Sequence, residues 1–197
     1  LLGTTSSSLP AYAYCPIVVV PYTDDKDNLL HLNNVITKVA VGSDDTKWGL
    51  RALQIAADFA ANWGAELDVI TVVPGNTNLD DPAQKQKFED VLDARLESIC
   101  TTHPDLKIRK SIVAGRAVET LTKASHTHDI VVVGSCGRGG LTGLLFNSTS
   151  QGLLQHSASP VYVVPRKFVE AEEQRVKTGT ASGTETAEVT SLEEFVR

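Results

Sequence analysis

The sequence predicts an α/β fold: a mainly parallel sheet of five strands with helices on both faces. Short apolar runs rich in β-branched residues alternate with segments of helical periodicity. One run, Asp129–Val133 (DIVVV), has the continuous β-branched character of a strand covered on both faces. The expected strands are Val35–Val41, Leu67–Val73, Ile108–Val113, Asp129–Val133 and Val161–Val164, and the expected helices are Lys47–Trp63, Pro82–Thr101, Ala117–Ser125 and Ser148–His156.

The turns between these segments support the assignment in chain order. The polar turn Gly42–Thr46 can cap the helix Lys47–Trp63, in which apolar residues recur every three or four positions. Gly64 ends that helix, and Pro74-Gly75 ends the second strand. Each later helix again leads into an apolar run, so right-handed crossovers between parallel strands are expected.

Composition excludes several classes of protein. The 197 residues carry 18 Lys and Arg against 24 Asp and Glu, a net charge of −6, which argues against binding nucleic acid through a basic surface. The longest apolar run, Ile17–Val20, is far too short for a membrane helix, so no membrane partner is expected. Three cysteines without a C-x-x-C pair exclude a disulfide framework and a cysteine zinc site and favour a cytoplasmic protein.

The beginning of the chain resembles its end. Residues 1–21 align without a gap on residues 145–165, with identical residues at Leu1, Thr5, Ser6, Leu9, Pro16, Val19, Val20 and Pro21. Chance similarity of two helix–strand pieces is the alternative to an internal repeat. A repeat makes residues 1–21 the last helix and strand of a preceding, truncated copy. The sequence also lacks methionine, so we expect it to be a piece of a longer protein.

The remaining chain then divides into three parts. Residues 22–34 are expected to be a linker, residues 35–165 a complete domain, and residues 166–197 a polar, flexible tail rich in Thr, Glu, Ala and Gly. The isolated strand Ile17–Val20 is expected to pair with the edge strand Val161–Val164, and self-association through Val161–Val164 of another copy is the alternative.

A glycine-rich loop, Gly134–Thr149, follows the fourth strand. Glycines allow main-chain N–H groups to approach an anion, and a helix N-terminus favours negative charge. Arg138 adds a positive charge, and Ser148 and Thr149 can donate hydrogen bonds to phosphate. A surface loop with glycines needed only for turns is an equally good interpretation from spacing alone. The P-loop pattern is absent, and the glycines follow the wrong strand for a Rossmann fingerprint.

The spacing Gly134-x2-Gly137-x9-Asn147-Ser148 resembles the G-x2-G-x9-G-[ST] nucleotide signature of the universal stress protein family. The segments VAVGSDDTKWGLRAL, GAELDVITVVP and PVYVVP also resemble the first, second and last strands of that family. The resemblance implies a five-stranded sheet in the order 3-2-1-4-5, pairing through the last strand, and an adenine nucleotide, ATP, with or without Mg²⁺. The repeat resembles the end of a second such domain, as in tandem members.

Carried over residue by residue, the resemblance assigns Asp44, with Ser43 beside it, to the ribose and adenine. It assigns Val72 to packing against the base. It assigns Gly134 and Gly137 to the phosphate loop, and Ser148 and Thr149 to the phosphate-binding start of the helix. Asn147 stands where the family has its third glycine, and its side chain could crowd the phosphates. This departure favours an alternative: a module that works without ATP, through pairing or partner binding.

The other candidate residues have plainer interpretations. Asp44-Asp45 could hold Mg²⁺, but helix capping is the preferred role of adjacent acids in a turn. His126 and His128 lack a third metal ligand and are expected to face solvent, and Cys136 is expected to be a small loop residue. No nucleophile with its base is recognisable, so we expect a stress-response regulator rather than an enzyme, with weak ATP hydrolysis as an alternative.

Overall fold

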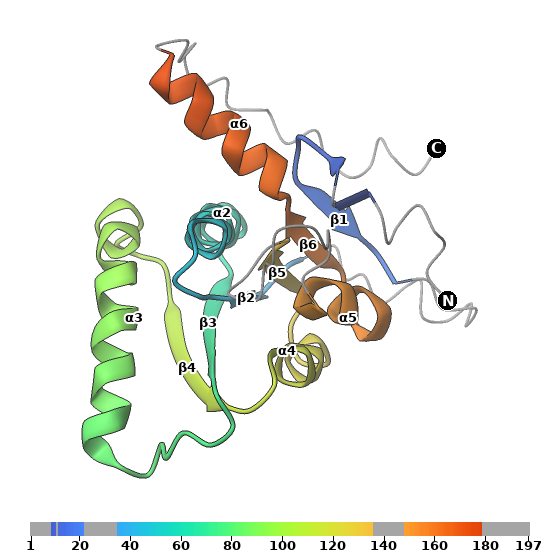
Figure 1. Cartoon of the computed structure of the whole chain (residues 1–197). Coiled ribbons are helices and arrows are strands. Elements are labelled where there is room, and N and C mark those ends of the chain that lie inside the picture. Colours follow the sequence, from blue (N-terminus) through green and yellow to red (C-terminus); the bar gives the residue numbers. More distant parts are fainter. Residues whose placement is uncertain (1–8, 11, 22–34, 136–147, 179–197) are drawn as a thin grey trace.

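The computed structural model describes residues 9–10, 12–21, 35–135 and 148–178. Its sheet has the strand order β1-β6-β5-β2-β3-β4 (Figure 1). The strands are β1 Ile17–Val19, β2 Lys38–Gly42, β3 Glu66–Val73, β4 Ile108–Ala114, β5 Ile130–Gly134 and β6 Val161–Val164. The helices are α2 Lys47–Trp63, α3 Pro82–Thr102, α4 Ala117–Ser125, α5 Ser148–His156 and α6 Arg166–Lys177.

Strands β2 to β6 confirm the order predicted from the sequence. Strand β2 lies in the centre and pairs in parallel with β3 on one side and β5 on the other, and β4 and β6 continue the sheet outward. Such a sheet buries its central strands on both faces, and the core residues of β2 and β5 are accordingly Val, Ala and Ile. From β2 the chain first adds β3 and β4 on one side and then β5 and β6 on the other. The strand order therefore reverses between β2 and β5.

The predicted count of five strands is wrong, because β1 adds a sixth. Strand β1 pairs antiparallel with β6, with Ile17 opposite Val163 and Val19 opposite Val161. This confirms the expected pairing of Ile17–Val20 with Val161–Val164, here within one chain. The prediction of five counted only the strands of residues 35–165, whereas β1 lies before that range.

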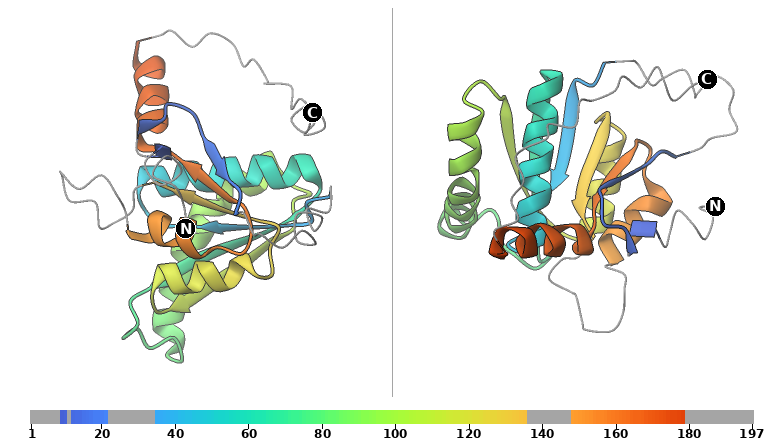
Figure 2. Two further views of the ribbon diagram at one scale, coloured as in Figure 1. Left: turned by 90° about the vertical axis from the view of Figure 1, so that its right-hand side faces the viewer. Right: turned by 90° about the horizontal axis from the view of Figure 1, so that it is seen from above.

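The helices cover both faces of the sheet and form two cores (Figure 2). Helices α2, α3 and α6 pack on one face, where Leu53, Leu92 and Val169 are buried against β2 and β3. Helices α4 and α5 cover the other face through Leu121 and Leu153. Within the described ranges, no helix is long and apolar enough to cross a membrane.

The expectation of a flexible tail is wrong for its first twelve residues, which form α6. Val169 of this helix is buried, and Phe168 packs against the same core. The sequence prediction averaged the composition of residues 166–197, and the Thr- and Gly-rich end concealed a segment of good helix formers with an apolar pair. Residues 179–197 lie outside the described residues.

Candidate functional site

The carboxyl ends of β2 and β5 meet where the strand order reverses. Val41 of β2 lies opposite Val132 of β5, so Ser43 and Gly134 lie at neighbouring positions as the chain leaves the sheet. Helix α5 connects the parallel strands β5 and β6 and must run antiparallel to them, so its N-terminus lies at the same edge. This is the position at which open α/β sheets bind ligands.

The turn after β2 is held in place by Asp44. Its Oδ1 accepts hydrogen bonds from the N–H and the hydroxyl of Thr46, at 3.0 and 2.5 Å. Thr46 in turn is the N-cap of α2 and accepts from the N–H of Gly49. A Cβ at position 49 would lie 2.1 Å from Asp44 Oδ1, so only glycine leaves room for this carboxylate. Thr46 is therefore the N-cap of α2, and Asp44 holds Thr46 in position through two hydrogen bonds.

Ser43 lies between this turn and the sheet. Its N–H donates to the carbonyl of Ile70 at 2.9 Å, and the residue is only 5% exposed. Its hydroxyl is buried and has no hydrogen-bond partner among the described residues. Thr71, which follows Ile70 in β3, also has a buried hydroxyl without a hydrogen-bond partner among the described residues. A buried hydroxyl without a partner costs about 1–3 kcal/mol, which a polar ligand atom could offset.

An apolar surface lies at the same edge, on the face covered by α4. Val72 of β3 is half-buried and packs against the core beneath α4. Its register partner on β4 is Val113, which is 36% exposed. Two adjacent, partly exposed valines suit the face of a planar ring. The sequence predicted Val72, whereas Val113 and Thr71 were missed because their exposure and pairing depend on the register of β3 and β4.

The glycine loop begins at Gly134, the last residue of β5. The next residue, Ser135, is buried; its N–H donates to the carbonyl of Val164, and its hydroxyl accepts from the N–H of Arg166 at 2.7 Å. At the other end of the loop, Thr149 lies half-buried in the first turn of α5. Gly137, Arg138, Cys136, Asn147 and the side chain of Ser148 lie outside what the structure describes.

The structure thus brings Ser43, Asp44 and Gly134 to one edge of the sheet, with Val72 close to that edge on β3. The N-terminus of α5, with Thr149, reaches the same edge. Among the described residues, no three His, Cys, Asp or Glu side chains are grouped so that they could hold a metal ion.

A second polar cluster lies away from this edge, in the amino half of β3. Asp68 is buried, and its carboxylate accepts hydrogen bonds from Arg109 at 2.5 Å and from Ser111 at 2.8 Å. Burial alone would raise the pKa of Asp68, but the hydrogen bonds from His128, Ser111 and Arg109 outweigh it and lower the pKa below its ordinary value of 3.8.

His128 completes this second cluster and corrects one prediction. His126 is exposed as expected, but His128 is buried. Nδ1 of His128 lies 2.9 Å from the carbonyl of Ala124, and Nε2 lies 3.4 Å from Asp68 Oδ2. The hydrogen bond to Asp68 raises the pKa of His128, although burial opposes it. The sequence prediction considered only metal ligation for His128 and overlooked Asp68 of β3 as its partner.

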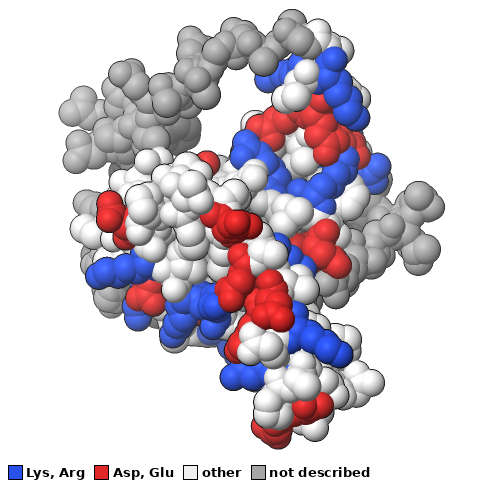
Figure 3. Space-filling model, turned by 90° about the vertical axis from the view of Figure 1, so that its left-hand side faces the viewer, with Lys and Arg blue, Asp and Glu red and all other residues white. Residues whose placement is uncertain are grey.

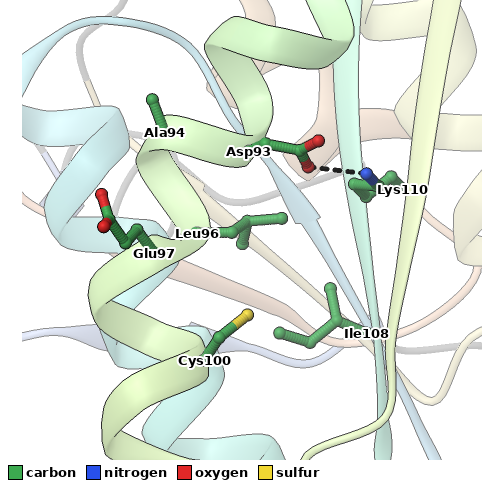
Figure 4. A pocket seen from close by; sticks show the side chains of 7 residues that line it. All are labelled: Asp93, Ala94, Leu96, Glu97, Cys100, Ile108 and Lys110. Atoms are coloured by element: carbon green, nitrogen blue, oxygen red, sulfur yellow. Dashed lines mark hydrogen bonds and ion pairs between the residues drawn. The ribbon is translucent and has the colours of Figure 1, made fainter.

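A cavity of about 510 Å³ lies between α3 and the edge strand β4 (Figure 4). Leu96 and Cys100 point from the helix toward Ile108 of the strand, and an ion pair of 2.6 Å joins Asp93 to Lys110. None of the residues predicted to bind nucleotide lines this cavity.

The model of the universal stress protein family matches residues 36–165, most of the chain. The chain belongs to this family. Universal stress protein Rv2005c of Mycobacterium tuberculosis is 36% identical over 171 residues, which cover 83% of this chain and 56% of the relative. This universal stress protein chain therefore spans about half the length of the curated relatives it matches.

Solved structures agree on the fold. Universal stress protein UspA from Lactobacillus plantarum superposes with a TM-score of 0.58 at 20% identity, covering 66% of this chain and 98% of that one. A universal stress protein solved in complex with cAMP superposes with a TM-score of 0.54 at 22% identity, covering 66% and 98%. These similarities establish the α/β architecture.

Proposed function

We propose that this universal stress protein domain binds an adenine nucleotide, ATP, at the carboxyl edge between β2 and β5, and serves as a regulatory module of the stress response. The observation that carries the proposal is the buried hydroxyl of Ser43, which has no partner among the described residues and lies between the Asp44 turn and Gly134. A ligand with polar atoms at this position would satisfy that hydroxyl.

Each part of the edge suits one part of the nucleotide. The half-buried Val72 and the exposed Val113 offer an apolar surface for adenine. Asp44 can accept hydrogen bonds from ribose hydroxyls, because in the described turn its hydrogen bonds to Thr46 use one carboxylate oxygen, Oδ1. Gly134 and the start of α5 belong to the phosphate side, where Thr149 and the helix N-terminus favour an anion.

Gly137, Arg138, Asn147 and Ser148 complete the proposed phosphate side from the sequence motif. The proposal includes no chemical step, because among the described residues none of the site side chains is paired with a general base. The solved relative with cAMP binds an adenine nucleotide, so ATP, AMP and cAMP belong in the same test.

The proposed organisation of the chain is a tandem fragment. Residues 1–21 would close a preceding copy, residues 22–34 would be the linker, and residues 35–165 would form the complete domain. Support comes from the internal repeat, from the pairing of β1 with β6, and from a longer relative of which the matched residues cover only 56%.

A second candidate function is a pairing module that has lost its nucleotide. Asn147, in the place of the third motif glycine, is the observation that favours it. Such a module would act through the sheet edge at β1 and β6, where Val18 and Val20 remain exposed. An exposed apolar edge strand is a natural association surface.

Isothermal titration of ATP, AMP and cAMP, each with and without Mg²⁺, distinguishes the two candidates. The nucleotide proposal predicts saturable binding of at least one of the three to the unmodified chain. Binding only to the Asn147→Gly variant would favour the pairing module, with a site that the asparagine has closed. Absence of binding to both chains would refute the nucleotide proposal.

A further inference from the structure

Helix α6 joins both loops of the candidate nucleotide site. Its first residue, Arg166, donates its N–H to the hydroxyl of Ser135 at 2.7 Å, directly at the start of the glycine loop. It also packs on α2, the helix that begins after the Asp44 turn, and its Val169 is buried in the core that α2 helps to form. A displacement of α6 therefore disturbs the segments that follow both β5 and β2.

The contact between α6 and α2 includes two ion pairs. Arg51 of α2 makes a two-pronged ion pair with Glu172, with distances of 2.8 and 2.7 Å, and the two side chains are about one-third exposed. Lys47, in the first turn of α2, pairs with Glu173 at 2.7 Å. In Figure 3 acidic side chains lie among basic ones along α6. Partly exposed pairs of this kind are weak individually and are screened by salt.

The same edge holds a third cation, on α6 itself. Arg166 pairs with Glu170 at 2.6 Å, and its guanidinium lies 5.6 Å from the centre of the Trp48 ring. Lys47 Nζ lies 5.5 Å from the centre of that ring, so Trp48 interacts with both cations. With α6 packed on α2, the side chains of Lys47, Arg51 and Arg166 each have a glutamate of α6 as their partner.

We propose that α6 is a regulatory helix whose docking on α2 opposes nucleotide binding; the inference rests on the proposed function. An anionic nucleotide at the carboxyl edge is attracted by Lys47 and Arg51 and repelled by the carboxylates of α6. Docking neutralises these cations, and release of α6 restores their charge. Because coupling between two events is reciprocal, bound nucleotide must weaken docking by the same factor.

A charge-neutral double variant tests this coupling. Glu172→Gln with Glu173→Gln removes both ion pairs to α2 while keeping side-chain size. We expect ATP to bind about threefold to tenfold more tightly than to the unmodified chain in isothermal titration at low salt. The matched control, Glu89→Gln with Glu97→Gln on α3, makes the same change in net charge and should alter affinity less than twofold.

Hydrogen exchange gives the reciprocal measurement on the unmodified chain. Saturating ATP should accelerate exchange of the α6 amides by the same factor, while the amides of α3 stay unchanged. Equal ATP affinity of the unmodified chain and the α6 variant, with unchanged exchange, would overturn the coupling and leave the nucleotide proposal standing. If no ATP binds to any of the chains, the nucleotide proposal fails, and the coupling fails with it.

Discussion

Two sets of buried polar side chains on one sheet differ in a single respect. In the amino half of β3, the carboxylate of Asp68 accepts from Arg109 and Ser111 and faces the imidazole of His128. At the carboxyl edge, the buried hydroxyl of Ser43 has no partner among the described residues. Folded proteins satisfy nearly all buried polar groups. The first set therefore has a structural role, and the second is the one that we propose to be arranged for a ligand.

The largest expected effect concerns the structural cluster. Asp68→Ala leaves the buried imidazole of His128 without its carboxylate, and breaking such a pair costs about 3–5 kcal/mol of unfolding free energy. Urea denaturation measures the loss. The control is Asp93→Ala, which removes an exposed ion pair to Lys110 and should cost no more than about 1 kcal/mol. Equal losses in the two variants would mean that the buried cluster has no special structural role.

Gly49→Ala is expected to have the next largest effect, at the carboxyl edge. Its Cβ would collide with Asp44 Oδ1, so the turn must shift, at a cost of about 1–3 kcal/mol. ATP affinity should fall as well, because Asp44 would leave its position.

The control for this variant is Gly75→Ala, whose Cβ would make only ordinary contact, 3.7 Å from the Cα of Gly115. It should change stability by no more than about 0.5 kcal/mol. A Gly49→Ala protein with unchanged stability and affinity would contradict the role assigned to the Asp44 turn.

Much of this comparison could be predicted from the sequence. β-branched runs and the turns between them are local properties, so they predicted strands β2 to β6, whereas the order of these strands was implied by the family resemblance. Ser43, Asp44 and Gly134 were predicted from the family resemblance, and the structure places them at the carboxyl ends of β2 and β5. The buried cluster was missed, because the contact of Asp68 with His128 joins residues far apart in sequence. Its one local signal was an aspartate inside an otherwise apolar strand, ELDVITVV.

Helix α6 was missed for a related reason. The formation of α6 depends on tertiary contacts: Val169 is buried in the core, and Glu172 and Glu173 form ion pairs with α2. None of these partners is close in sequence, and helices of this length gain most of their stability from packing.

A matched pair of serine substitutions sharpens the contrast. Ser111→Ala removes a hydrogen bond to the buried Asp68 and should cost about 1 kcal/mol of stability without changing ATP affinity. Ser43→Ala removes a buried hydroxyl that has no partner among the described residues, so stability should not fall and should rise by up to about 1–3 kcal/mol. ATP affinity should nevertheless fall about threefold to tenfold. The reverse pattern in denaturation and titration would exchange the roles of the two sets.

The smallest expected effect is a dependence of stability on pH. The pKa of His128 in the folded protein lies above its ordinary value of 6.5, because Asp68 stabilises the imidazolium. The contribution of this pair is therefore complete below pH 6.5 and is lost as the pH rises through the raised folded-state pKa. Urea denaturation across this range should show the decline in the unmodified chain and a flatter profile for His128→Gln. Parallel profiles would show that another group titrates.

A crystal structure of the chain with ATP tests the central claim most directly. We expect the nucleotide at the carboxyl edge between β2 and β5, with one of its polar atoms within hydrogen-bond distance of the Ser43 hydroxyl. Occupancy only of the cavity between α3 and β4, or a carboxyl edge without nucleotide at saturating ATP, would contradict the claim that the unpartnered hydroxyl marks a ligand site.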